Sequence, residues 1–198
     1  MKNKKELIES LNLENQLSLE DIPNLDLYMD QVIQLFENKF AASKRNDDEK
    51  VLTKTMINNY AKGKLFFPIK NKKYSKEHLI LISMIYQMKS ALSIKDVKMA
   101  LDQLNSKITD ENFNLQRLYH SYLDLMDKNS AMFKNDVDEH WKDINNEVKE
   151  LDNNHADDEV YLEQVLLVAT FSSMSNYYRR AAEKIVDDMK KEGNKDEA

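Results

Sequence analysis

Apolar residues recur every three or four positions through most of this chain, which is the spacing of amphipathic helices. A first helix is expected at 25–42. Its apolar residues are Leu25, Met29, Val32, Phe36 and Phe40. Residues 18–21 have the Ser-x-x-Asp form of a capping box, which is typical of a helix start. The polar segment 41–50 shows no apolar period and is expected to be a linker or a long turn.

A short helix is expected next, directly after Thr53, because a threonine hydroxyl can accept a hydrogen bond from the first turn. The apolar residues Met56, Ile57 and Tyr60 would face the core. Gly63 supplies a conformationally permissive residue where this helix must stop.

A small hairpin and two further helices complete the first half of the chain. Residues 65–69 are extended by composition, and Lys-Asn-Lys-Lys at 70–73 is expected to form the hairpin tip. A strongly apolar helix is expected at 78–92. The Ser-x-x-Asp capping box at 93–96 predicts the start of another helix.

The second half predicts two long helices, separated by a polar cluster at 152–155. Apolar residues in both helices alternate spacings of three and four, which indicates a coiled coil or a helical hairpin. In the first helix they are Val137, Trp141, Ile144, Val148 and Leu151, and in the second they are Phe171, Met174, Tyr178, Ala181 and Ile185. Residues 192–198 are expected to be a disordered tail.

Composition supports an all-α fold. Two glycines and two prolines in 198 residues leave little turn chemistry for strands. The absence of cysteine excludes disulfides, thiolate zinc sites and cysteine nucleophiles. The chain has no apolar leader and no run of eighteen apolar residues, so we expect a cytoplasmic protein without a membrane segment.

Charge is strongly segregated along the chain. Residues 50–98 carry eleven lysines and two acidic residues, a net charge of +9 in a protein whose total is -6. Residues 110–198 carry 21 acidic and 11 basic residues, a net charge of -10. A basic segment on an acidic protein indicates a phosphate-binding surface, and duplex DNA is the expected partner.

The order of these elements resembles the DNA-binding head of MerR-type regulators. Residues 56–68 are similar to the stretch of that family that ends in Tyr-Tyr, a few residues and Gly-Leu-Leu-Pro-Pro. The matching residues are Ile57, Tyr60, Leu65 and Pro68. Residues 74–79 and 93–97 are similar to its Tyr-Ser-x-x-Asp-Leu and Ser-Leu-x-Glu-Ile motifs. Thr55 and Asn58 stand where that family has phosphate-binding arginines.

This resemblance implies a winged helix-turn-helix head with a small β-hairpin wing at 22–106. An N-terminal arm at 1–21 precedes the head, and an antiparallel body of two long helices at 107–191 follows it. Over about 22–186 the chain is also similar to an uncharacterised bacterial family catalogued as domain of unknown function 1836. That resemblance is closer, lies in stretches such as 52–60, and implies no established activity.

The short helix would enter the major groove of DNA, with its polar residues outward. Asn58 or Asn59 would read adenine, and lysines would hold phosphates. The candidate DNA-binding residues are Lys54, Thr55, Asn58, Asn59, Lys62, Lys64, Lys70, Lys72, Lys73 and Tyr74. Two alternatives stay open: a lysine-rich face that binds nothing, and a protein-interaction adaptor whose lysines bind an acidic partner.

The C-terminal helices are the expected site of homodimerisation, because two copies multiply the contacts of one short recognition helix. The alternative is a hairpin that completes the core of one chain. A weaker hypothesis is a pocket for an apolar or anionic effector. Its candidate residues are Tyr122, Trp141, Tyr178 and Arg179. The scattered histidines and the lack of catalytic motifs predict no metal, no cofactor and no enzymatic activity.

Overall fold

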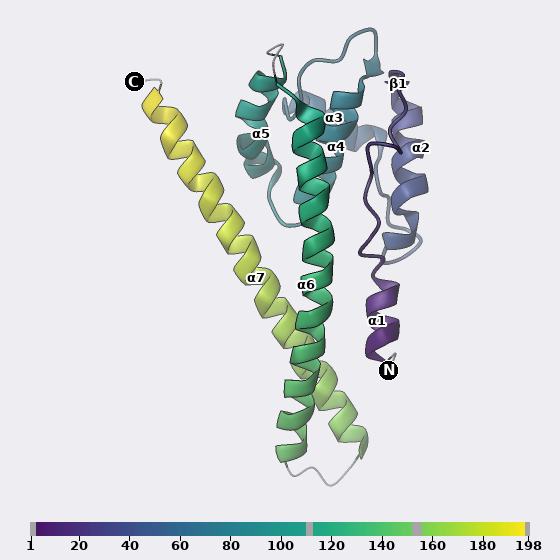
Figure 1. The fold of residues 1–198 in the computed structure, drawn as a ribbon, viewed down its shortest axis with the longest axis vertical. Coiled ribbons are helices and arrows are strands. Elements are labelled where there is room, and N and C mark those ends of the chain that lie inside the picture. The colour runs from purple at the N-terminus through teal and green to yellow at the C-terminus, as the bar shows by residue number, and fades with distance from the viewer. Residues whose placement is uncertain (1–2, 110–112, 152–155, 197–198) are drawn as a thin grey trace.

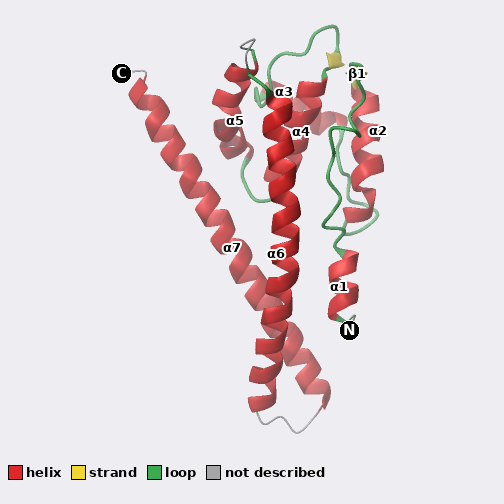
Figure 2. Cartoon of the chain, viewed as in Figure 1, coloured by secondary structure: helices red, strands yellow, loops and turns green. Residues whose placement is uncertain are grey.

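The computed structural model describes residues 3–109, 113–151 and 156–196, and it is mostly helical (Figures 1 and 2). In chain order its elements are α1 (Lys4–Ser10), β1 (Leu27–Tyr28), α2 (Met29–Phe40), a 3-10 turn (Ala41–Ser43), α3 (Lys54–Lys62), β2 (Lys73–Tyr74), α4 (Lys76–Met88), α5 (Ile94–Ile108), α6 (Leu115–Glu150) and α7 (Ala156–Asp196). Within these ranges, no helix combines the length and apolarity that a bilayer crossing needs.

The first helix begins later than 25, so the predicted start is wrong. Leu27 and Tyr28 form β1 instead, which pairs antiparallel with β2 in the register Leu27 with Tyr74 and Tyr28 with Lys73. Helix α2 therefore starts at Met29, and the side chain of Gln31 accepts a hydrogen bond of 2.8 Å from the Tyr28 backbone amide. This strand pairing joins segments far apart in the sequence, and a periodicity of apolar residues does not report such pairing.

Helix α3 begins where its sequence predicts, since Thr53 Oγ1 accepts a hydrogen bond of 3.1 Å from the Met56 amide. It also ends as predicted, at Lys62 with Gly63 as its C-cap, but Gly63 does not use the conformational freedom of glycine. Gly63 has the right-handed φ of -73°, and Lys64 has the left-handed φ of 55°. A Cβ at Gly63 would lie 2.7 Å from Leu65 Cδ1. A larger residue at 63 would therefore require the buried Leu65 side chain to shift, whereas the backbone at 63 has a conformation that any residue adopts.

The tight turn predicted at 70–73 is confirmed, but residues 65–69 form no strand: β2 pairs with β1 instead, and a single bridge between Lys70 and Lys73 closes the turn. The segment 64–74 that carries this turn is called the hairpin below. The Lys73 amide donates to the Lys70 carbonyl at 2.9 Å. The two central residues, Asn71 and Lys72, have φ values of 50° and 59°. Positive φ at both central positions is the mark of a type I′ turn, whose twist matches that of paired strands.

The main hydrophobic core is built by the N-terminal arm, the helices α2 to α5 and the first turns of α6. Tyr119 of α6 is fully buried, and its Oη donates to the Leu17 carbonyl at 2.6 Å and lies 2.9 Å from Ser83 Oγ. Leu115 and Tyr122 of α6 also pack into this core. The core thus crosses the boundary that the sequence suggests between 106 and 107.

Two long helices are confirmed, and they pack together over only part of their length. Ile144 and Val148 of α6 are buried with Leu167 of α7 in a second apolar cluster, at the lower end of Figure 1. Helix α7 then diverges from α6 and contacts α5. It continues to Asp196, so most of the predicted tail is helical. The predicted polar cluster at 152–155 lies outside the described residues.

Two buried tyrosines allow a matched test of the core. The Tyr60 hydroxyl is buried and has no hydrogen-bond partner in the described part of the chain. Because removing a bonded group leaves its buried partners unsatisfied, Tyr119→Phe should lower the free energy of unfolding by about 1–3 kcal/mol. Tyr60→Phe should leave it unchanged or raise it by about 1 kcal/mol, since no bond is lost. Urea unfolding measures both, and equal losses in the two variants would contradict the assigned hydrogen bonds.

Candidate nucleic-acid interface

Helix α3 presents one polar face to solvent. Its apolar residues Ile57 and Tyr60 are buried, which fixes the rotation of the helix. The five predicted contact residues of α3 are all exposed: Lys54, Thr55, Asn58, Asn59 and Lys62. Since this helix has no acidic residue, its free face offers hydrogen-bond donors, amides and positive charge to a ligand.

One of these lysines has a partner in its own chain. Lys54 Nζ lies 2.7 Å from Asp30 Oδ1 in the first turn of α2, and both side chains are largely exposed. Exposed ion pairs of this kind contribute little to stability and are screened by salt. Lys54 can therefore exchange the carboxylate for another anion, although Asp30 adds a negative charge beside this end of α3.

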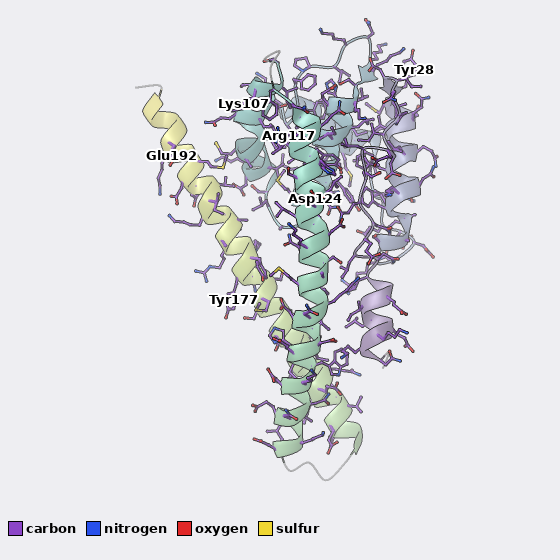
Figure 3. All side chains as sticks on the ribbon, viewed as in Figure 1. Tyr28, Lys107, Arg117, Asp124, Tyr177 and Glu192 are labelled. Carbon is purple, nitrogen blue, oxygen red and sulfur yellow. The ribbon has the colours of Figure 1, made fainter. Side chains whose placement is uncertain are left out.

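The hairpin supplies further positive charge. Lys64, Lys70 and Lys72 are exposed, and the loop that carries the last two arches over the upper end of the molecule (Figure 1). Lys73 is half-buried, with its Nζ 5.2 Å from the centre of the Tyr28 ring. Tyr28 lies at this same end in Figure 3. Three hairpin lysines are thus free to contact phosphates, and the fourth is held against an aromatic ring.

Tyr74 does not belong to the exposed surface, so its prediction as a DNA contact is corrected. It is 1% exposed, and its ring packs edge-on to that of Phe66 with 6.2 Å between centres. Burial also raises the pKa of its hydroxyl. Strand residues alternate between two faces, and pairing with Leu27 turns Tyr74 inward. Its role is to anchor the hairpin.

His78 is a structural residue of this site that the sequence pattern did not identify. Its Nδ1 accepts a hydrogen bond of 3.1 Å from the Ser75 amide, and its Nε2 lies 3.1 Å from the Phe67 carbonyl. This network assigns the proton to Nε2, which donates to Phe67. His78 therefore joins the start of α4 to the loop before the hairpin. The sequence feature that indicates this role is the Ser-x-x-His spacing at 75–78. Histidine there takes the position that Glu or Gln holds in a capping box.

The electrostatics of His78 follow from its burial. Desolvation lowers the pKa of its imidazole, against the smaller opposing effect of the Phe67 carbonyl. The ring also packs 3.9 Å, centre to centre, from the ring of Phe67.

Lys89 is half-buried, and desolvation lowers the pKa of its ammonium group. Lys89 lies over the Tyr86 ring and is not part of the exposed basic surface.

The four residues predicted for an effector pocket do not come together. Tyr122 stacks on Tyr119 in the main core, with 5.8 Å between ring centres. Trp141 packs in the second cluster, nineteen positions after Tyr122 on the same helix, which is roughly 28 Å along the axis. Tyr178 is 67% exposed on α7, and Arg179 pairs with Glu183 at 2.6 Å. No single ligand could contact all four.

Metal-binding groups are also scattered. Among the residues that the structure describes, no three histidine or acidic side chains cluster closely enough to hold a metal ion. The site consists of exposed lysines and amides on α3 and the hairpin.

Comparison with known proteins points to one family. Neither the curated proteins nor the solved structures contain a match to the chain. The family described as domain of unknown function (DUF1836) matches residues 17–122, which is more than half of the chain. The matched segment covers most of the main core, including Tyr119 at the start of α6. The chain therefore belongs to the family of the domain of unknown function DUF1836.

Proposed function

We propose that the protein binds duplex DNA through a winged helix-turn-helix formed by α2, α3 and the hairpin at 64–74. The observation that carries this proposal is the exposure of every predicted contact residue on α3, together with three exposed hairpin lysines. The net charge of +9 over 50–98 makes a polyanion the best-suited ligand. The type I′ turn at 70–73 provides a rigid tip of the kind that a wing requires.

In this proposal, α3 enters the major groove and the hairpin follows the backbone. Asn58 or Asn59 can pair with N6 and N7 of adenine through two hydrogen bonds. The lysines hold phosphates, which fixes the register of the protein without reading sequence. A lysine is a point charge rather than a planar fork, so its contacts tolerate some variation in backbone geometry.

The connection between α2 and α3 is longer than in a simple helix-turn-helix. It spans 41–53, whereas such turns usually have about three or four residues. Val51 and Leu52 in this segment are buried, and α2 still contacts α3. The extra residues therefore form a surface loop, and α2 and α3 still pack together. This arrangement is compatible with the insertion of α3 into the major groove.

Salt dependence tests the proposal. Five exposed lysines (Lys54, Lys62, Lys64, Lys70 and Lys72) predict a log-log slope of binding against salt of about -4 to -5 per protomer. Fluorescence anisotropy with a labelled duplex at several salt concentrations measures it. Lys62→Ala should reduce the slope by about one unit, and Lys142→Ala, an exposed lysine of α6, should not. Absence of binding at low salt by the folded protein would refute the proposal.

We further propose that two copies associate through α7. The apolar row predicted on this helix, from Phe171 to Ile185, has no covering partner over its second half in one chain. Tyr178 is 67% exposed and Ile185 is 63% exposed, with Ala181 exposed between them. Tyr177, labelled in Figure 3, adds a further exposed ring. Apolar residues at this spacing on a long helix are typical of a helix–helix interface.

A pair of charge substitutions tests this association. Tyr178→Glu/Ile185→Glu should convert a dimer into a monomer, because four carboxylates would enter one apolar interface. Analytical ultracentrifugation measures the mass. Tyr161→Glu/Val168→Glu is the matched control, since both residues are exposed on α7 but lie on another face of the helix. A monomeric wild-type protein, or dimers in both variants, would contradict the proposal.

A further inference from the structure

A cavity lies between the N-terminal arm, α4 and α6, away from the proposed DNA-binding surface. Its volume is about 360 Å³, within the range of small-molecule sites. The apolar part of its lining includes Leu13, Tyr86, Leu123, Met126 and Phe133. Among the described residues that line it, none carries a charge at neutral pH. A ligand that fits this lining is neutral and mostly apolar.

The hydroxyl of Ser130 in this cavity has no hydrogen-bond partner in the described part of the chain. Ser130 is 9% exposed, and its Oγ forms no hydrogen bond with any described residue. A buried helical serine usually bonds to the carbonyl four residues earlier, but no such bond is present. Leaving a buried hydroxyl unsatisfied destabilises a protein, so a molecule in the cavity that hydrogen-bonded to Ser130 would remove this cost.

The cavity is closed on one side by the arm, which α6 holds in place. Gln16 Nε2 donates to Asp127 Oδ1 at 2.9 Å, and Lys134 Nζ lies 2.8 Å from Glu14 Oε1. Asn12 Nδ2 donates to the Ala42 carbonyl at 2.8 Å, which ties the arm to the end of α2. A ligand between arm and helix would therefore contact elements that already form one packed unit.

We propose that this cavity binds a neutral, largely aromatic small molecule whose hydroxyl or amine group hydrogen-bonds to Ser130. The aromatic rings of the lining suit a flat ligand, and Ser130 gives it orientation. This site is distinct from the predicted effector pocket, with which it shares Tyr122 alone. It does not depend on the proposed DNA binding.

Two probes of nearly equal shape test the proposal: 2-naphthol, which carries a hydroxyl group, and 2-methylnaphthalene, which does not. Calorimetric titration, with the protein in the syringe, gives both affinities. The wild-type protein should bind 2-naphthol at least about fivefold more tightly, the value of one hydrogen bond. Ser130→Ala should remove this preference while the binding of 2-methylnaphthalene persists. The same variant should unfold at an equal or higher temperature, which a purely structural hydroxyl would not permit.

A matched pair of variants tests the location. Met126→Trp fills the cavity and should weaken both probes by at least about tenfold. Met132→Trp, at a position 61% exposed on the same helix, should change neither affinity by more than about twofold. Circular dichroism establishes folding, and if Met126→Trp fails to fold, Ser130→Ala decides. No binding to the wild-type protein, or an unchanged 2-naphthol preference in Ser130→Ala, would overturn the proposal.

Discussion

Lys62→Glu/Lys70→Glu is expected to weaken duplex binding by about 100-fold or more at 0.1 M salt. Both side chains are exposed, one at the end of α3 and one on the hairpin. Each lost phosphate contact costs roughly eightfold at this salt concentration, from a slope of about 0.9 per phosphate, and the new carboxylates add repulsion. Fluorescence anisotropy against a labelled duplex measures the loss.

A control with the same change in net charge separates local contact from overall charge. Lys128→Glu/Lys142→Glu alters two exposed lysines of α6 within the acidic half of the chain, and should change affinity by less than about threefold. Equal losses in the two double variants would indicate a diffuse charge effect. If neither variant lost affinity, the basic face would serve another partner, such as an acidic protein.

The local elements of this fold follow from its sequence. The caps at Thr53 and Ser93 predict the starts of α3 and α5, because a cap is a short-range contact between a side chain and the next turn. Lys-Asn-Lys-Lys predicts its turn for the same reason, since asparagine tolerates a positive φ. The exposure of the α3 contact residues also follows, because Ile57 and Tyr60 define the buried face.

The errors in the prediction arise where distant segments meet. Tyr74 looks like part of a basic, exposed tip until its strand pairs with Leu27, far away in the sequence. The same pairing moves the start of α2. Helix α6 shows the effect again: its apolar period is continuous, but Tyr119 packs with the arm while Ile144 packs with α7. Periodicity identifies a buried face without identifying what covers it.

The same limit explains why α7 could not be placed from its pattern. The alternation over Phe171 to Ile185 predicts one continuous helix–helix contact along this side of α7. In the structure Phe171 lies against Phe133, 6.5 Å between ring centres, whereas Tyr178 and Ile185 face solvent in one chain. The second copy that we propose would give those residues the apolar partner that their spacing implies.

His78→Leu is expected to lower the free energy of unfolding by about 2–5 kcal/mol, because the Ser75 amide and the Phe67 carbonyl would each lose a buried hydrogen bond. His78→Gln should cost less, since glutamine can still accept from the Ser75 amide in a capping box. Urea unfolding at pH 7.5 measures both variants. Equal stability of the wild type and His78→Leu would contradict the bridging role of the imidazole.

The pH dependence of stability gives an independent measure of this bridge. Burial lowers the pKa of His78 in the folded protein, so the unfolded chain binds more protons just below the ordinary histidine pKa of about 6.5. The stability contributed by the neutral ring is therefore present above that value and is lost as the pH falls toward the folded-state pKa. Between pH 7.5 and 5.5 the wild type should lose more stability than His78→Gln, which has no group at this position that titrates. An equal loss of stability in the two proteins would mean that another group is responsible for the titration.

Duplex binding should respond to the same protonation. Because the protonated ring cannot accept the Ser75 hydrogen bond, acidification should loosen the hairpin and weaken duplex binding in the wild type more than in His78→Gln.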